Sequence, residues 1–555
     1  MRGHLRGLPR ASDKFVNTEA SALLRRRRVS RACYACALSA ALNSVSIGYD
    51  IGVSAGVAPE LQQDLALSNA QVELFVGALN FIACFGVFLS PLFSDRYGRR
   101  AAFAATAAFN IVGLAVAVTS QGFAALMIGR VIVGASVGLG LALDPLYISE
   151  ISPAEHRGML VSYSEVGINV GITLGFVSDF AFSGLPPSAS WRAMLGVGTL
   201  LPLVILGIAK WGIVESPRWL VAQGRSSDAI DVLTTLAGPQ AQPADVALSL
   251  AAVEEEVRAH EWERRAVGWR FLLAPSAALR RMLLVGVGVA AAQQIVGIDG
   301  IQYFMLYLLE QSGVRERGAR FGILVGLGAF KLGCVFVSGM FLVDRWGRRP
   351  TLIASSLGCA CALMLLATNF LINTESIPQY ANAAPALSVV ALAMYFGAFS
   401  LGVGPTCWLV PAEVFPTAVR AKAMALATFA NRAVAALVAS RFLTLADAMG
   451  YGGASLLLAA FCLLVAAFVY VAVPETKARP RLSPRSHIAS PPAPPTPHPH
   501  PLPVFQGRTL EEMTAHFCEA TGDESARLVL DQAAAECCAA RRGRGGEGGE
   551  TATGK

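Results

Sequence analysis

The stretch SDRYGRR, from Ser94 to Arg100, recurs as DRWGRR, from Asp344 to Arg349, in the second half of the 555-residue chain. Each copy is a short charged segment with a central glycine, and each follows a long apolar run. A segment of this kind can act merely as a topology signal, but its return at an equivalent place favours a specific contact between helix ends. The repeat therefore indicates two related halves.

Apolar runs long enough to cross a bilayer as helices, about 20 residues each, recur along both halves. The chain is 54% hydrophobic and 15% charged, with a mean hydropathy of +0.52, which is too apolar for one soluble core. The runs lie near 32-57, 71-93, 101-120, 122-148, 158-182 and 191-214, and then near 280-309, 319-343, 351-373, 387-410, 421-447 and 451-473. The sequence predicts an all-α membrane protein with twelve transmembrane helices in two six-helix bundles. Such duplication is typical of two-bundle transporters.

Arginine residues collect on one side of this predicted membrane protein. Arg25 to Arg28 precede the first run and both repeated segments fall on the same side, whereas the opposite loop SGLPPSAS (Ser183 to Ser190) carries no charge. Because cytoplasmic loops carry an excess of Lys and Arg, both termini are predicted to be cytoplasmic. The net charge of +7 follows from this bias, so we expect no nucleic-acid partner.

Five segments are expected from the apolar runs and the polar stretches between them. They are a cytoplasmic N-terminal segment (1-31), an N-terminal bundle (32-214), a cytoplasmic linker with short helices (215-279), a C-terminal bundle (280-473) and a cytoplasmic tail (474-555). The tail contains a Pro- and His-rich insertion at 478-506 that cannot bury a core. The insertion is interpreted either as a genuine linker or as a retained intron.

The sequence lacks the motifs of enzyme chemistry. Most of the cysteines lie inside apolar runs, where they act as small hydrophobic residues. The pair in CYAC (Cys33 to Cys36) has the spacing of half a redox or zinc site, but no second pair accompanies it. There is no phosphate-binding glycine loop, HExxH motif or nucleophile elbow. We therefore expect no enzyme activity, no metal and no cofactor.

Several motifs together resemble the sugar porter family of the major facilitator superfamily. Besides the repeated segments, they are GRVIVG (Gly129 to Gly134), ESPRWL (Glu215 to Leu220), QQIVGID (Gln293 to Asp299), PAEVFPTAVRAKAMA (Pro411 to Ala425) and PETK (Pro474 to Lys477). Within the family, the stretch from Arg157 to Phe182 and the pair Asn431 and Arg432 look most like plant polyol/monosaccharide proton symporters. The resemblance implies alternating access between two bundles.

Asp50 stands inside the first apolar run, in NSVSIGYDIGVSAG (Asn43 to Gly56). A charged Asp in mid-membrane costs roughly 2.5 to 3.5 kcal/mol, so it needs a cation or a proton. Arg130 is the nearest candidate, because the fourth span of such a bundle packs against the first. A pair about 4 Å apart would gain on the order of 4 kcal/mol at an effective dielectric of 20, and its separation would favour protonation. The resemblance implies that Asp50 is the proton site and Arg130 its partner; the alternative is a static buried ion pair.

A substrate site is expected between the bundles at mid-membrane, where amides and carboxylates can exchange hydrogen bonds with hydroxyls. Gln293, Gln294 and Asp299 supply these groups on one run, and a helix break at Gly297 is needed for them to face one site. By resemblance, these three residues, Trp408 and Asn431 match sugar-contacting positions. Glu165 stands where polyol carriers have an acid. The alternatives are interhelical packing for the two glutamines and aromatic packing for Trp408.

A cytoplasmic gating network is predicted from charged residues at helix ends, which would latch the outward-facing state and separate on switching. Its members are Asp95, Arg99, Arg100, Glu150, Arg157, Glu215, Arg218, Asp344, Arg348, Arg349, Glu413 and Arg420. Two positions depart from the family pattern. Asp144 is interpreted either as a second titrating group or as a side chain that reaches water, and Gln302 leaves the identity of the substrate open.

The sequence thus predicts a proton-coupled symporter of a polyol or monosaccharide, with the lipid bilayer as its surroundings and a monomer as its functional unit. A plasma-membrane location is expected, with an internal membrane as the alternative. Two other functions remain open at this point: a facilitative uniporter, and a sugar sensor that binds without transport.

Overall fold

The computed structural model describes residues 29–153, 156–239, 242–266, 272, 274–338, 343–372, 378–476 and 517, and the regular structure of these residues is helical. The predicted arginine anchors at Arg25 to Arg28 and the insertion at 478-506 lie outside the described residues.

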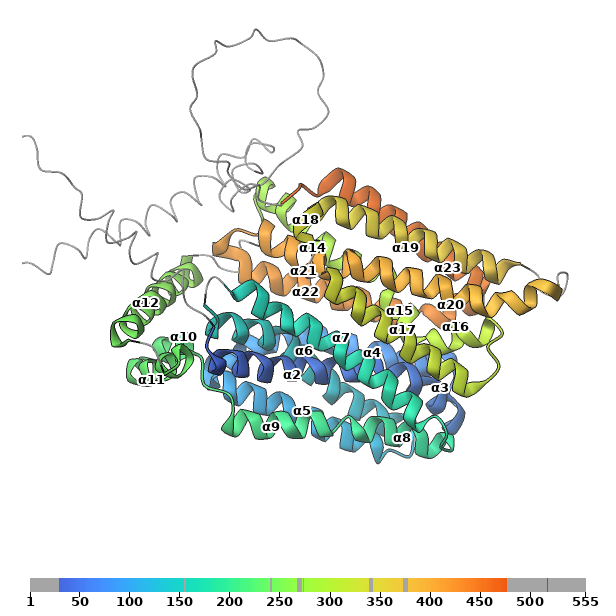
Figure 1. Cartoon of the computed structure of the whole chain (residues 1–555), viewed down its shortest axis with the longest axis horizontal. Helices are drawn as coiled ribbons and strands as arrows, with labels where there is room; N and C mark the ends of the chain where they lie inside the picture. The colour runs from blue at the N-terminus through green and yellow to red at the C-terminus, as the bar shows by residue number, and fades with distance from the viewer. Residues whose placement is uncertain are drawn as a thin grey trace, which may run out of the picture.

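Two helical bundles lie side by side, with their long helices running roughly along the longest axis of the molecule (Figure 1). The first contains α2 (Arg31–Gly52), α3 (Ser54–Asp64), α4 (Asn69–Tyr97), α5 (Arg99–Val118), α6 (Phe123–Ile151), α7 (Arg157–Phe182), α8 (Pro187–Val197) and α9 (Leu200–Trp211). The second contains α14 (Ala277–Ile295), α15 (Ile298–Tyr303), α16 (Met305–Gln311), α17 (Arg317–Val337), α18 (Val343–Trp346), α19 (Arg348–Leu371), α20 (Pro378–Leu401), α21 (Val403–Val414), α22 (Thr417–Ala439) and α23 (Phe442–Ala472).

Three helices lie between the bundles in the chain, namely α10 (Pro217–Ala222), α11 (Ser226–Ala237) and α12 (Pro243–Ala266). They gather at one end of the molecule, drawn in green in Figure 1. We refer to this end as the cytoplasmic end, following the arginine bias of the sequence, and to the opposite end as the outer end.

Eleven helical segments of the described chain are long and apolar enough to cross a membrane. The remaining crossing is supplied by α2 with α3, which continue each other across Val53. This first crossing carries polar residues, among them Asn43, Ser44 and Asp50, and all three are buried inside the bundle. Twelve crossings in two bundles agree with the predicted fold.

The eleventh crossing is shorter than the predicted run. The helix expected to extend to residue 447 ends at Ala439, and a short helical part begins at Phe442, whereas the last long helix begins after Gly450, near residue 451 as predicted. Gly450, with φ of 74° and ψ of 160°, is not helical and separates this short part of α23 from its longer part over residues 451–472. Because the residues on both sides of Ser440 and Arg441 are mostly apolar, hydropathy alone did not locate the turn between α22 and α23.

Close backbone contact holds α2 against α7. Glycines recur every fourth residue on both helices, at Gly48 and Gly52 of α2 and at Gly171 and Gly175 of α7. A Cβ atom on Gly48 would lie 2.0 Å from the carbonyl oxygen of Ile168. Small residues at this spacing let membrane helices pack at short range.

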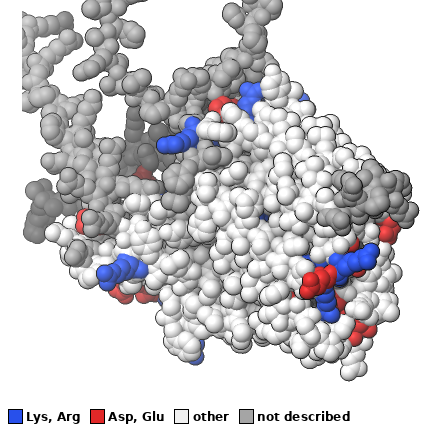
Figure 2. Space-filling model, turned by 45° about the vertical axis from the view of Figure 1, so that its right-hand side comes forward, with Lys and Arg blue, Asp and Glu red and all other residues white. Residues whose placement is uncertain are grey.

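The surface fits a chain surrounded by lipid. Figure 2 shows Lys, Arg, Asp and Glu confined to small groups, separated by a wide uncharged surface. Exposed apolar side chains include Leu92, Leu464 and Val471, which lie on crossing helices. Because no water-soluble protein needs so broad an apolar face, the surface agrees with an integral membrane protein.

Candidate functional site

Asp50 lies within α2 and is 2% exposed. Its Oδ2 accepts a hydrogen bond of 2.7 Å from the amide of Asn110 on α5. Among the described residues, no ion pair joins it to Arg130, although the two are within electrostatic range of each other. The expected pairing at about 4 Å is therefore not made in this conformation.

Arg130 of α6 is also buried, and it is held by groups other than Asp50. Its Nη2 donates to Ser54 Oγ at 2.6 Å, its Nε donates to the carbonyl of Phe75 at 3.1 Å, and its guanidinium lies 4.4 Å from the centroid of the Phe75 ring. Ser54 Oγ in turn donates to the backbone carbonyl of Asp50 at 2.7 Å. One serine thus separates the two charges.

Asp144 is a second buried carboxylate of α6, and it does not reach water. Its oxygens accept from the amide of Asn43 at 2.8 Å and from the hydroxyl of Ser44 at 2.5 Å. Both donors belong to α2, so Asp144 ties α6 to the helix that carries Asp50. Of the two interpretations of Asp144, access to water is wrong, because the side chain is almost completely buried.

The seventh crossing is interrupted at Gly297, which confirms the predicted break. α14 ends at Ile295 and α15 begins at Ile298, and Gly297 between them has φ of 91°, in the left-handed region that glycine adopts without strain. The break leaves Gln293 and Gln294 at the end of one helix and Asp299 at the start of the next.

The predicted amides lie together at this break. Gln293 Oε1 accepts from the Asn431 amide at 2.8 Å, and Gln293 Nε2 donates to the carbonyl of Gly404. Gln294 Nε2 lies 3.4 Å from Gln293 Oε1, whereas Gln294 Oε1 is buried without a hydrogen-bond partner. Trp408 is half-buried and packs against the main hydrophobic core.

Asp299 takes part in a polar cluster that crosses from one bundle to the other. The amide nitrogen of Asn80, on α4, donates to Asp299 at 3.0 Å and lies 3.3 Å from the hydroxyl of Tyr303. The amide oxygen of Asn80 accepts from Arg432 on α22 at 3.2 Å, and Arg432 also donates to the Asn431 oxygen. Asn80, Asp299 and Arg432 are buried, and they link the halves at mid-membrane.

Glu165 faces the second bundle from α7. Its carboxylate is within electrostatic range of Lys331 on α17 and of Arg432. Lys331 is 6% exposed, and its Nζ donates to Gln302 Oε1 at 2.7 Å. Neither Lys331 nor Gln302 was among the predicted site residues.

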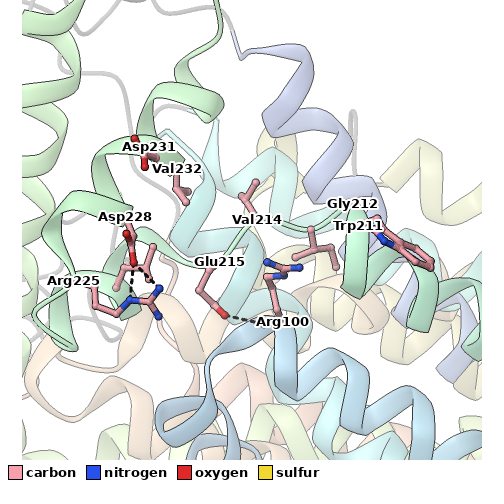
Figure 3. A pocket seen from close by; sticks show the side chains of 11 residues that line it. Arg100, Trp211, Gly212, Val214, Glu215, Arg225, Asp228, Asp231 and Val232 are labelled. Carbon is pink, nitrogen blue, oxygen red and sulfur yellow. Dashed lines mark hydrogen bonds and ion pairs between the residues drawn. The ribbon is translucent and has the colours of Figure 1, made fainter.

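The first repeated segment forms an ion-pair cluster at the cytoplasmic end. Arg99 makes a two-pronged contact with Glu150 of α6, with distances of 2.7 and 2.8 Å, and lies 3.3 Å from Asp95. Glu215, which follows α9, accepts from the backbone N–H groups of Arg99 and Arg100 at 2.7 and 3.3 Å. Figure 3 shows Glu215 beside Arg100, in the wall of a cavity of about 410 Å³ that also contains the ion pair of Arg225 and Asp228.

The second repeated segment forms the equivalent cluster in the other half. Arg348 contacts Glu413 of α21 at 3.0 Å. Glu475, which follows α23, accepts from the backbone N–H groups of Arg348 and Arg349 at 2.9 and 3.1 Å. In both halves a carboxylate therefore caps the N-terminus of the helix after the repeat, where the helix dipole favours negative charge.

The other predicted gating residues have different partners. Arg218 pairs with Glu256 on α12, and Arg420 donates to the carbonyl of Phe415. Arg157 has a buried Nε without a hydrogen-bond partner. The side chain of Asp344 lies outside the described part of the chain.

The outer ends of the two bundles are joined directly. Arg317 of α17 pairs with Glu60 of α3 at 2.6 Å, Tyr307 donates to Gln62 at 2.7 Å, and Asn69 donates to Asp447 at 2.7 Å. The cytoplasmic clusters of Arg99 and Arg348, by contrast, each lie within one bundle. The contacts between the bundles therefore close the outer end.

Comparison with known proteins identifies the family. A family model described as "Sugar (and other) transporter" matches residues 36–482. The chain belongs to this family. "Probable polyol transporter 4" of Arabidopsis thaliana is 38% identical over 471 residues, which cover 84% of this chain and 87% of that protein.

Solved structures of sugar transporters share the fold. The xylose transporter XylE from E. coli, in a partially occluded inward open conformation, superposes with a TM-score of 0.69 at 23% identity, covering 81% of this chain and 100% of XylE. A crystal structure of a D-xylose-proton symporter gives a TM-score of 0.63 at 25% identity, and the match covers 80% of this chain and 98% of the symporter. The twelve-helix major facilitator fold and a multi-pass membrane location follow from these matches, and this sugar transporter is not an enzyme.

Four polar residues of this sugar transporter were not predicted as site residues from the sequence: Asn80, Gln302, Lys331 and Glu475. Lys331 carried a usable signal, because a lysine inside an apolar run is expensive and marks a functional position. Glu475 also carried one, since PETK occupies in the second half the place that ESPRWL has in the first. Asn80 had no such signal, because a neutral amide in a membrane helix is common at helix contacts.

Proposed function

We propose that the chain is a proton-coupled symporter of a neutral polyol or monosaccharide, acting as a monomer in the plasma membrane by alternating access. One observation carries the proposal: Asp50 is buried and makes no ion pair, while Arg130 is hydrogen-bonded to Ser54, one helical turn further along the same crossing. The names of similar proteins, a polyol transporter and a D-xylose-proton symporter, support both the substrate class and the coupling.

The proton site follows from the two alternative partners of Arg130. Ser54, which now accepts from Arg130, lies one turn beyond Asp50 on α2. A shift of about 5.4 Å, one helical pitch, would bring the guanidinium from the serine to the carboxylate. Paired with Arg130, Asp50 would stay charged; separated from it, as here, Asp50 would hold a proton while it accepts from Asn110.

The substrate site is supported by unmet hydrogen-bonding capacity between the bundles. Gln294 Oε1 is buried with no donor, which is costly unless a ligand supplies one. Gln293, Asn431 and Asp299 lie at the same helix break, and Trp408 offers an aromatic face on which a sugar ring can pack. Sugar hydroxyls both donate and accept, so they suit such a mixed set of groups.

The cytoplasmic clusters around Arg99 and Arg348 were predicted to latch the outward-facing state and to separate on switching. In the present conformation each cluster is complete within its own bundle, and the outer end is closed. We assign the clusters to holding the cytoplasmic helix ends in place while the bundles rock, so that the substrate meets only one side of the membrane at a time.

Uptake into liposomes containing the purified protein tests the proposal. Labelled sorbitol, inositol and glucose are offered with and without an inward proton gradient, to the wild type, to Asp50→Asn and to the control Glu254→Gln on α12. A membrane potential of about 100 mV supplies roughly 2.3 kcal/mol per proton and one pH unit about 1.4. Their sum supports roughly 500-fold accumulation.

The expected result is accumulation in the wild type and the control, and its loss in Asp50→Asn with exchange of substrate preserved. Accumulation that persists without Asp50 would remove this residue from the mechanism. Equilibration that ignores the gradient would make the protein a facilitative carrier, and binding without flux would make it a sensor.

A further inference from the structure

Lys331 is a cation in the middle of a membrane-crossing helix. It lies 14 residues after Arg317, the first residue of α17, and is 6% exposed. Ionisable residues at such a depth are rare, face the interior of a bundle, and mark substrate or ion pathways. Lys331 has no place in the proton transfer proposed for Asp50 and Arg130, so its presence needs a separate explanation.

The surroundings of Lys331 fix its position but leave donors for a ligand. Its Nζ donates to Gln302 at 2.7 Å and lies 5.9 and 6.0 Å from the ring centroids of Phe396 and Phe399. An ammonium group has three N–H donors, and Gln302 is the one hydrogen-bond acceptor that it contacts among the described residues. The aromatic rings stabilise the charge without accepting its hydrogens in a fixed direction.

Two carboxylates and a second cation form the charged surroundings of Lys331. Lys331 is within electrostatic range of Asp299, on its own bundle, and of Glu165, on the other. Both carboxylates also interact with Arg432. Two positive and two negative groups therefore balance, and this balance favours a neutral ligand, because a charged one would leave a charge uncompensated at low dielectric.

Lys331 and Glu165 also lie at the seam between the bundles. One turn before Lys331, the carbonyl of Gly328 accepts from the hydroxyl of Thr173 on α7 at 3.3 Å. Glu165 belongs to the same helix, two turns nearer the cytoplasmic end than Thr173. An ammonium on one bundle and a carboxylate on the other thus lie on the cytoplasmic side of a direct contact between the bundles, one and two helical turns from it, and they interact electrostatically.

We infer that Lys331 is a specificity-determining residue, which donates to one hydroxyl of a neutral substrate while a neighbouring hydroxyl donates to Glu165. This inference rests on the proposed function and refines it. A hydroxyl accepts from an ammonium and donates to a carboxylate equally well, so adjacent hydroxyls are the chemical feature that this pair recognises. Gln302 holds the lysine in place for this contact.

Counterflow exchange without a proton gradient tests this inference separately from coupling. KM and the maximal rate are measured for the transported substrate and for its series of single deoxy analogues, with the wild type, Lys331→Met and Lys331→Gln. Loss of a charged hydrogen bond should raise KM about tenfold or more in Lys331→Met, with a smaller change in the maximal rate. For one deoxy analogue, KM should already be raised in the wild type and should rise no further in the variant.

Lys210→Met is the matched control. Lys210 lies in the last turn of α9, at the cytoplasmic end, where its Nζ lies 4.7 Å from the Trp211 ring, and its replacement should leave KM unchanged. If Lys331→Met does not fold, Lys331→Gln gives the comparison with N–H donors retained and the charge removed.

The inference is overturned if Lys331 variants raise KM equally for every analogue, or if they change the maximal rate alone. Either result would make Lys331 a packing residue. A wild type that exchanges no sugar or polyol would instead refute the proposed function, so the two failures are distinguishable.

Discussion

Asp144 shows how a single buried carboxylate can stabilise a functional helix. It accepts from Asn43 and Ser44, and both donors would lose their partner in Asp144→Ala. Because an unsatisfied buried donor costs about 1 to 3 kcal/mol, Asp144→Ala should lower the Tm of the purified protein by more than Asp144→Asn, which keeps one acceptor. Thermal unfolding in detergent measures the Tm of both variants. Asn43→Ala, which removes one of the two donors, should have a smaller effect. Loss of proton-driven accumulation at unchanged Tm in Asp144→Asn would instead make Asp144 a second proton-transferring group.

Functional residues could be predicted from the sequence where a charged residue interrupts an apolar run. Asp50 interrupts an apolar run, so its burial and its need for a partner could be expected. The partner of Arg130 could not be predicted, because Ser54 and Asp50 lie one turn apart on the crossing formed by α2 and α3. The position of α6 relative to this crossing decides which of them Arg130 contacts. Lys331, like Asp50, is a charged residue inside an apolar run, but its contact with Gln302 depends on how α17 packs beside α15.

The helices that follow the repeated segments depend on two glycines. Gly98 and Gly347 precede α5 and α19 with φ of 90° and 94°, and a Cβ atom on either would lie within 2.7 Å of the Glu215 or Glu475 carboxylate. Gly98→Ala should therefore lower the Tm, because Ala at positive φ costs about 1 to 2 kcal/mol and displaces the capping carboxylate. Gly122→Ala is the matched control: Gly122 precedes α6 with φ of −161°, and no atom lies within 4 Å of its added Cβ. Equal Tm values for the two variants would contradict the capping role.

Helix boundaries could be predicted where apolar residues give way to polar or charged ones. The break at Gly297 falls between amides and a carboxylate, and the repeated glycines stand among charges, so each is visible in the sequence. The turn at Ser440 and Arg441, by contrast, directly follows one mostly apolar stretch and precedes another. Hydropathy does not mark so short a turn, which explains why the predicted run continues to residue 447, whereas the gap predicted between 447 and 451 contains the break at Gly450.

At the scale of the whole molecule, the contacts between the bundles determine which side of the membrane is closed. The mid-membrane cluster around Asn80 and the outer pairs join the halves, while the cytoplasmic clusters belong to single bundles. The sequence predicted two bundles and their charged cytoplasmic ends. It did not predict the outer contacts, because Glu60 and Arg317 are distant in the chain and no repeat relates them.

The outer ion pair should bias the equilibrium between the two end states. Glu60 is almost buried and Arg317 partly exposed, so the pair adds about 1 kcal/mol to outer closure, at the upper end for an exposed pair. Glu60→Gln should shift the ratio of outer-open to outer-closed molecules by about fivefold. Spin labels at Gln63 of α3 and Arg315, both exposed, measure this as a longer mean distance between the outer ends. The charge exchange Glu60→Arg with Arg317→Glu should restore the wild-type distribution, and Glu254→Gln on α12 should leave it unchanged. An unchanged distance in Glu60→Gln would mean that Tyr307, Asn69 and the Asn80 cluster close the outer end without help from this pair.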